Sequence, residues 1–279
     1  MKVLLGVATY PTPPEVYPAC QAALDALDFG DHVVEVRYYG NDDPKKSGVE
    51  NLRDKHGRMR SDVLDGDYDA LFTVEADMIV PPDTLTKLAA VDADVACGLY
   101  VSRSSRIWLC IPQIDGYTGV ALNADPGAAR DAWGKVIRSE GAGFGCTLIH
   151  RNVLAATEFR ADPRNRFADD WQFALDVKEK GFRMAHDLSV ICGHILHDRS
   201  ERGVASGGVL WPDIDAPNLH RVEGLGIPNH QGVALPERAT YRVRRLISGP
   251  SREYRPGDTI ELDAESAAIL LERRAIEII

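Results

Sequence analysis

The sequence lacks paired cysteines and lacks any apolar run long enough to span a membrane. Its cysteines are odd in number and scattered without a CxxC spacing: Cys20, Cys97, Cys110, Cys146 and Cys192. This usage is typical of reduced, buried thiols in a cytoplasm-like compartment. A membrane-spanning helix needs about 20 apolar residues, and the apolar stretch Met1–Ala8 is short and shows no signal-cleavage pattern. We therefore expect a cytoplasmic protein with no membrane partner.

Positive charge is also scarce. The chain has 32 Lys and Arg residues against 42 Asp and Glu residues, which gives a formal net charge of -10 at pH 7. This balance argues against a general nucleic-acid coat protein, although it is compatible with a local basic groove. A chain of 279 residues with 44% hydrophobic content is long enough for one large core, or for one core and a small module.

Two phosphate-binding signatures are missing. No Gly-Lys-Ser/Thr follows the glycine-rich stretch Gly141–Cys146, so this stretch is not a P-loop. The loop after the first apolar run, Thr9–Pro14, contains neither glycine nor lysine. A nucleotidyltransferase would normally carry a glycine-rich, basic loop at that point, so this class of enzyme is the less favoured alternative.

What the sequence does contain is an alternation of apolar strands and amphipathic helices. Strands are expected at 2–8, 34–38, 70–74, 93–100 and 147–150, with shorter ones at 107–111 and 120–122. Helices are expected from about residue 14, over 49–64 with an interruption near Gly57, after an Asp83 cap, and over 169–180. This order favours an α/β fold with a mostly parallel sheet flanked by helices.

The stretch Leu71–Asp83 carries two carboxylates at the end of a buried strand. Glu75 and Asp77 are spaced i, i+2, which places both on one side of an extended chain. Ligands of open α/β sheets bind beyond the carboxyl ends of the strands, and hard cations that bridge phosphates prefer carboxylate oxygens. The residues alone fit a metal site and a polar strand end equally well.

Three further features follow along the chain. Gly141–Cys146 allows either a close approach of a ligand or a tight bend. Asp169 and Asp170 stand at the start of a helix. Capping requires only one acid, so the other is available for chemistry. His194 ends a strand after a glycine, and histidine is a common ligand of Mn-type and Zn-type ions.

The remaining sequence divides in two. Residues 201–238 are rich in glycine, proline and asparagine and show little periodicity, as in an active-site lid or a linker. Residues 239–279 are regular again and are expected to form a small α+β module with a helix over 263–274. Residues 1–200 form the expected catalytic domain.

Taken together, four blocks in order resemble the GT-A (Rossmann-like) glycosyltransferases, and in particular the family-2-like branch common in bacteriophage genomes. Glu75-Ala-Asp77 resembles the acidic DxD block, although its first acid is a glutamate. Gly141–Gly145 resembles the glycine-rich strand that lines the sugar site, 168–173 the ED block, and Cys192-Gly-His194 the terminal histidine. The match covers roughly residues 1 to 200.

This resemblance implies a metal-dependent, inverting transfer of a sugar from a nucleoside-diphosphate sugar, with UDP the expected nucleotide. Asp77 and His194 would hold Mn²⁺ or Mg²⁺, and Glu75 would contact the ribose or a metal-bound water. Asp170, the second acid of its pair, would be the catalytic base, and Asp169 would cap the helix by accepting from backbone N–H groups. The remaining contacts to the donor are expected from Thr9, Arg58, Ala76, Gly143 and Arg199.

The acceptor is open at this point. Hydroxymethylated pyrimidines in phage DNA, a virion protein and a surface glycan all offer a hydroxyl group, and a phage-encoded enzyme would act in the host cytoplasm. The negative net charge of the chain argues against DNA as the acceptor, and the basic set Arg242, Arg244 and Arg245 argues for it. A non-catalytic nucleotide-sugar-binding or virion structural protein is the second alternative.

Overall fold

The computed structural model describes residues 1–11, 15–116, 118–161, 169–197 and 205–224, and, after these, the segments 238–243, 247–248, 253–254, 258–263 and 276–278. The chain divides into two compact units. The first comprises residues 1–196 and 208–223, and the second comprises residues 197–207 and 224–279.

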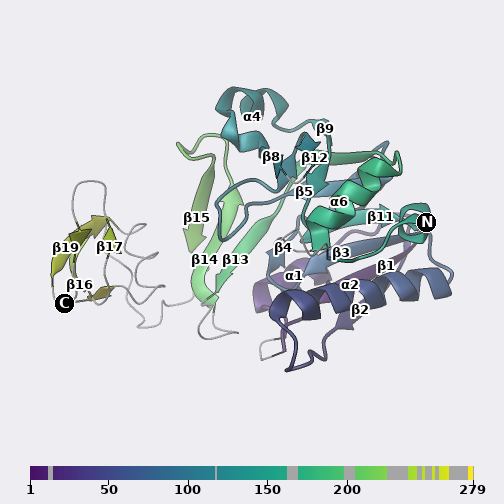
Figure 1. Cartoon of the computed structure of the whole chain (residues 1–279), viewed down its shortest axis with the longest axis horizontal. Helices are drawn as coiled ribbons and strands as arrows, with labels where there is room; N and C mark the ends of the chain where they lie inside the picture. The colour runs from purple at the N-terminus through teal and green to yellow at the C-terminus, as the bar shows by residue number, and fades with distance from the viewer. Residues whose placement is uncertain are drawn as a thin grey trace. The chain divides into compact units, whose positions relative to one another are not determined.

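The centre of the first unit is a seven-stranded sheet in the order β2-β1-β3-β11-β5-β12-β9 (Figure 1). Its members are β1 (Lys2–Ala8), β2 (Val33–Tyr39), β3 (Ala70–Glu75), β5 (Val95–Leu99), β9 (Val136–Ser139), β11 (Cys146–His150) and β12 (Met184–Ile191). Strand β1 pairs in parallel with β2 and β3, and β5 pairs in parallel with β12, whereas β11 and β9 pair antiparallel with their neighbours. The predicted α/β fold with a mostly parallel sheet is confirmed.

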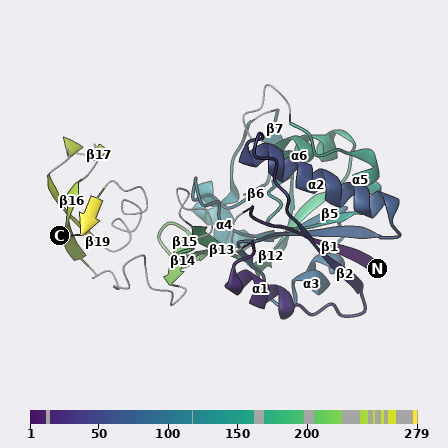
Figure 2. The ribbon, with the colours of Figure 1, turned by 90° about the horizontal axis from the view of Figure 1, so that it is seen from below.

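Helices cover both faces of this sheet. Figure 2 shows α2 (Gly48–Asp65), α5 (Arg151–Ala156) and α6 (Asp169–Glu179) on one face, with α1 (Pro18–Asp25) and α3 (Thr84–Ala90) on the other. The first face packs through Met59, Val63, Val153 and Phe173, which are all buried. Burial on both faces explains why β1, β3 and β5 are nearly continuous apolar runs.

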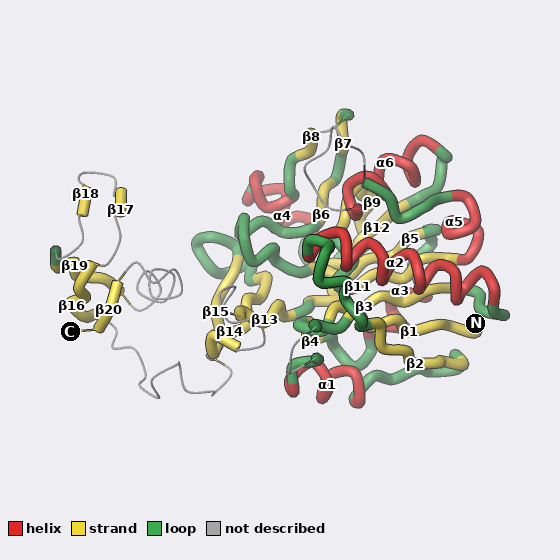
Figure 3. The backbone as a smooth tube through the Cα atoms, turned by 60° about the horizontal axis from the view of Figure 1, so that its bottom comes forward, coloured by secondary structure: helices red, strands yellow, loops and turns green. Residues whose placement is uncertain are grey.

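Several local expectations need correction. Helix α2 is not interrupted at Gly57 but runs unbroken to Asp65 (Figure 3). Its start is fixed by a capping box between Ser47 and Glu50, and a single glycine costs only about 1 kcal/mol in a helix. Helix α1 begins at Pro18 rather than near residue 14. Asp83 makes no capping hydrogen bond and instead pairs with Lys87 at 2.9 Å.

The segment between β5 and β9 is made of short elements. Strand β6 (Cys110–Ile111) pairs with β10 (Gly141–Ala142), and β7 (Ile114–Asp115) pairs with β8 (Thr118–Gly119). The strand expected at 120–122 is wrong, because a 3-10 helix (Leu122–Ala124) and then α4 (Pro126–Ala132) occupy this part of the chain. Asp125 caps α4 by accepting from the backbone N–H groups of Gly127 and Ala128.

A second sheet pairs the strand that carries His194 with the strand that follows Glu75 and Asp77. Its order is β15-β14-β13-β4, formed by β4 (Met78–Ile79), β13 (Gly193–His197), β14 (Ala205–Pro212) and β15 (His220–Gly224). In the antiparallel register of β13 and β4, His194 lies opposite Met78, and the N–H of Ile195 donates to the carbonyl of Asp77 at 2.8 Å. Part of the stretch expected as a lid or linker is therefore strand within the first unit.

The described segments of the second unit include two small sheets. Strands β19 (Thr259–Asp263) and β20 (Ile276–Ile278) flank β16 (Arg238–Val243), and β17 (Ile247–Ser248) pairs with β18 (Glu253–Tyr254). The helix expected over 263–274 lies almost entirely outside the described residues. Within the described ranges, no helix combines the length and the apolar character that crossing a bilayer requires.

Candidate active site

The segments that carry the expected chemistry converge at one edge of the central sheet. Strands β1, β3, β5 and β12 run in the same direction, so their carboxyl ends lie together. At or shortly after these ends lie four candidate residues, one for each strand: Tyr10, Glu75, Arg103 and His194. This edge is where open α/β sheets bind their ligands.

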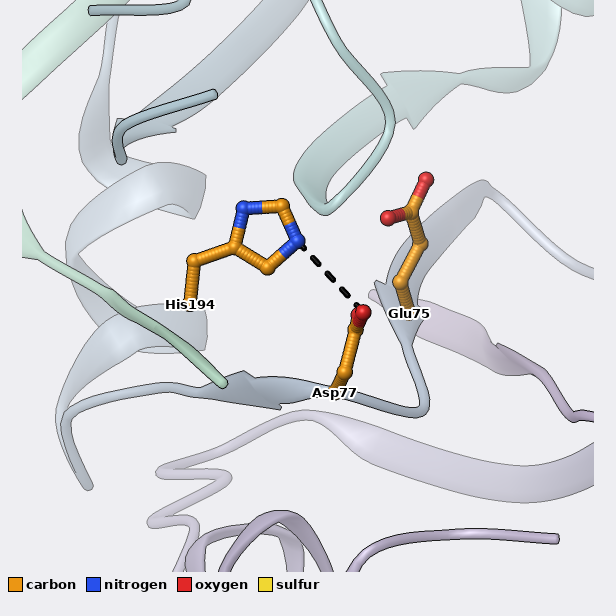
Figure 4. A group of neighbouring side chains, drawn as sticks. All are labelled: Glu75, Asp77 and His194. Atoms are coloured by element: carbon orange, nitrogen blue, oxygen red, sulfur yellow. Dashed lines mark ion pairs between the residues drawn. The ribbon is translucent and has the colours of Figure 1, made fainter. Parts of the chain in front are cut away.

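Glu75, Asp77 and His194 form a compact acidic cluster there. Their ligand atoms all lie within 4.8 Å of one another, and His194 Nε2 lies 3.5 Å from Asp77 Oδ2 (Figure 4). Asp77 is fully buried and His194 is 5% exposed. Burial and the neighbouring charge of Asp77 raise the pKa of the Glu75 carboxyl group above its usual range, so a positive charge placed in this cluster would be strongly stabilised.

The orientation of His194 fits metal binding. Its Nδ1 lies 2.8 Å from the carbonyl oxygen of Val101, and a carbonyl group only accepts, so Nδ1 carries the proton. In the neutral ring Nε2 then has the free lone pair and faces the two carboxylates. A histidine held in this way by a backbone carbonyl is the usual arrangement of a metal ligand. Two carboxylates and one imidazole suit Mn²⁺ or Mg²⁺ better than a soft ion.

Among the described residues, two further side chains bind Asp77 that the sequence did not reveal. The Tyr10 hydroxyl group donates to Asp77 Oδ2 at 2.6 Å, and Arg103 Nη1 donates to the same oxygen. Burial, reinforced by the charge of Asp77, raises the pKa of Tyr10 well above its usual value. Both residues lie within four residues of the end of a strand at this edge, which was the available signal for them.

The acid pair at the start of α6 is split between two roles. Asp169 is buried and accepts from His56 Nδ1 of helix α2 at 2.8 Å, and the rings of Phe144 and Phe159 pack against this histidine. Asp170 is only partly buried, and it accepts from the N–H of Trp171. Burial, with the charges of Asp169 and then Glu75, raises the pKa of Asp170 to about 7.

The contacts of Asp169 and Asp170 differ in part from the expected ones. Asp169 was expected to be the acid that binds backbone N–H groups, but it binds His56 instead, and Asp170 is the acid that accepts from a backbone N–H group. Asp170 nevertheless has the property that a general base needs, a pKa close to neutral pH. His56 was missed, although it shares the buried face of α2 with Asn51, Lys55 and Met59.

The glycine-rich stretch is shaped by a protein side chain. A Cβ atom on Gly143 would lie 2.2 Å from the Tyr100 hydroxyl oxygen, and one on Gly145 would lie 2.8 Å from the same ring. The N–H of Gly145 donates to the Tyr100 hydroxyl group at 3.0 Å, and the Tyr100 ring packs edge-on against His194. The glycines therefore allow the backbone to approach the Tyr100 ring closely, and that ring packs against His194 of the acidic cluster. A contact of Gly143 with the sugar donor stays a prediction.

Thr9 and Ala76 lie beside the cluster. Lys55, buried under the first loop, donates to the carbonyl oxygen of Thr9 at 2.7 Å and pairs with Asp42 at 2.6 Å. The backbone of Ala76 is tied on both sides, to the carbonyl of Ala8 and to the N–H of Tyr17. These contacts hold the backbone at Thr9, after β1, and at Ala76, after β3, in place at the edge of the sheet.

The structure does not bring Arg58, one of the expected donor contacts, to the cluster. Arg58 donates to the carbonyl oxygen of Gly40 and lies over the Tyr39 ring, in a separate surface hollow between α2 and β2. Arg199 lies outside the described residues.

The sequence matches no protein-family model, and no curated protein sequence matches it. Solved structures do resemble it. A197 from STIV matches 80% of this chain and 94% of its own length at 16% identity, with a TM-score of 0.50. Residues 1–349 of S. aureus TarS match 67% of this chain and 58% of their own length at 14% identity, with a TM-score of 0.40, and TarS has also been solved with UDP-GlcNAc. At these identities the comparison shows the fold, and the chain shares the α/β fold of A197.

Proposed function

We propose that the first unit is a metal-dependent, inverting glycosyltransferase that moves a sugar from a nucleoside-diphosphate sugar, with UDP as the nucleotide, to an acceptor hydroxyl group. The observation that carries this proposal is the Glu75, Asp77 and His194 cluster at the same sheet edge as a carboxyl group whose pKa is about 7. A cluster for a cation and a neighbouring base are the two parts that such a displacement requires.

Each residue has a separate task. Asp77 and His194 hold the cation, and Glu75 contacts either a metal-bound water or the ribose. The cation, when bound, neutralises the charge that develops on the leaving diphosphate. Asp170 accepts the proton of the acceptor hydroxyl group as its oxygen bonds to the anomeric carbon. The bond from that carbon to the diphosphate breaks on the opposite side, and this single displacement inverts the configuration.

Asp169 and His56 position this base. Their buried pair fixes the first turn of α6 against α2, and the negative charge of Asp169 contributes to the raised pKa of Asp170. A carboxyl group with an ordinary pKa would be a weaker proton acceptor at neutral pH.

Thermal unfolding with UDP and Mn²⁺, added separately and together, tests the binding part of the proposal. We expect stabilisation that requires both, because the cation and the diphosphate bind as a pair. Asp77→Asn should remove the effect, whereas Asp92→Asn, which only breaks a surface pair with Arg183, should retain it. An equal response of wild type and Asp77→Asn would contradict the metal assignment, and no response in wild type would favour a structural protein.

A further inference from the structure

The side chain of Arg103 lies in the acidic cluster. Arg103 belongs to the tight turn after β5, where the N–H of Ser102 donates to the carbonyl of Ile107 at 2.8 Å. Its Nη1 donates to Asp77 Oδ2 and lies 3.4 Å from the Tyr10 hydroxyl oxygen. The Arg103 side chain is 26% exposed, while that of Asp77 is fully buried. The guanidinium group is therefore a counter-ion of a carboxylate that is inaccessible to water.

Arg103 and a metal ion would draw on the same atom. Asp77 Oδ2 is the oxygen that Arg103 contacts, and it is also the one that lies 3.5 Å from His194 Nε2. A cation held between Asp77 and His194 would meet the guanidinium group at close range. Because two positive charges repel strongly in a poorly solvated site, the cation and the Arg103 contact compete for this oxygen.

A displaced Arg103 has a suitable new partner in a diphosphate. Among the described residues, Arg103 forms hydrogen bonds through Nη1 alone, so its other donors are available to a ligand. Guanidinium groups bind phosphate oxygens through two parallel hydrogen bonds. The partial exposure of Arg103 and its place in a turn leave room for the side chain to swing away from Asp77.

We propose that Arg103 is a displaceable counter-ion, which neutralises Asp77 until a divalent cation binds and then moves to the diphosphate of the nucleotide. This inference rests on the proposed function, because that function supplies the diphosphate. Its consequence is that binding of the cation and binding of the nucleotide are coupled. A cation alone must displace Arg103 without compensation, whereas a cation together with UDP gives Arg103 a new ion pair. Each ligand therefore increases the affinity for the other by the same factor.

The test is Mn²⁺ binding to the full chain by electron paramagnetic resonance, with and without UDP. In wild type we expect UDP to tighten Mn²⁺ binding by roughly 5- to 150-fold, the usual range of coupling between two sites. Arg103→Met removes the competitor, so Mn²⁺ alone should bind at least about fivefold tighter and the effect of UDP should shrink towards none. Arg103→Lys keeps the charge but loses the paired donors, so Mn²⁺ alone should bind as in wild type with a reduced effect of UDP.

Arg183→Met is the matched control, because Arg183 also pairs with a carboxylate, Asp92, but at the surface. It should leave both affinities unchanged. Unaltered Mn²⁺ affinity in a folded Arg103→Met variant would overturn the inference while leaving the proposed function intact. The same holds if UDP enhances Mn²⁺ binding equally in wild type and Arg103→Met. Wild type that binds neither Mn²⁺ nor UDP would overturn the proposed function itself, and the inference with it.

Discussion

Replacing Asp170 by asparagine should stabilise the protein while it abolishes transfer. The pKa of Asp170 in the folded chain is about 7, against about 3.9 in an unfolded chain. Because the folded value is raised, the contribution of Asp170 to stability is fully present below about pH 4 and is lost as the pH rises to about 7. Asparagine has the same shape and no charge, so the substitution removes this loss.

The expected size follows from the difference of about 3 pKa units. At about 1.36 kcal/mol per unit, ionised Asp170 lowers the free energy of unfolding by at most about 4 kcal/mol. Since the side chain is partly exposed, we expect Asp170→Asn to be about 2 to 4 kcal/mol more stable than wild type at pH 8. Near pH 4 the two proteins should be about equally stable.

Guanidinium unfolding in the presence of EDTA, followed by tryptophan fluorescence, measures this difference. All four tryptophans, Trp108, Trp133, Trp171 and Trp211, belong to the first unit, so the signal reports on that unit alone. An Asp170→Asn variant that is less stable than wild type at pH 8, or a difference that does not change between pH 4 and pH 8, would refute the assigned environment of Asp170.

Three other outcomes are expected. The kcat/KM of wild type should rise with pH through about 7, as Asp170 loses its proton, and a profile that falls over this range would contradict the base assignment. Asp169→Asn should destabilise the fold by about 3 kcal/mol at neutral pH, because it breaks a buried pair with His56, and unchanged denaturant midpoints would argue against that pair. Gly143→Ala should destabilise the fold by about 1–3 kcal/mol, because the new Cβ atom would collide with the buried Tyr100. Gly57→Ala, at an open position of α2, should stabilise the fold by up to about 1 kcal/mol. Equal effects of the two substitutions would contradict the close packing of Gly143 against Tyr100.

The sheet and the acidic cluster could be predicted because both follow from local patterns. Apolar runs that alternate with helices identify β1, β3, β5 and β12. The chemistry lies near the carboxyl ends of these strands, since Glu75 is the last residue of β3 and His194 comes three residues after β12. Carboxyl ends of parallel strands lie together, so residues far apart in the chain could be placed at one edge.

The side-chain partners could not be predicted, because they depend on long-range packing. His56 and Asp169 are 113 residues apart, and Tyr10 and Asp77 are 67 residues apart. His56 lies on the buried face of α2 and reaches the site, whereas Arg58, two residues later, lies on the opposite face and away from it. The glycine-rich stretch was ambiguous for a similar reason, since the side chain that requires it, Tyr100, comes from the residue that follows β5.

Release of UDP from a panel of UDP-sugars is the most direct test of the central claim. Wild type, Asp77→Asn and Asp170→Asn would each be incubated with candidate acceptors (hydroxymethylated DNA, protein and glycan), with Mn²⁺ or with EDTA, and both UDP and the modified acceptor quantified by mass spectrometry. The proposed mechanism predicts UDP release and sugar transfer by wild type with Mn²⁺, and loss of both in EDTA and in each variant. Release that persists in EDTA or in Asp170→Asn, or no release from any UDP-sugar, would contradict it.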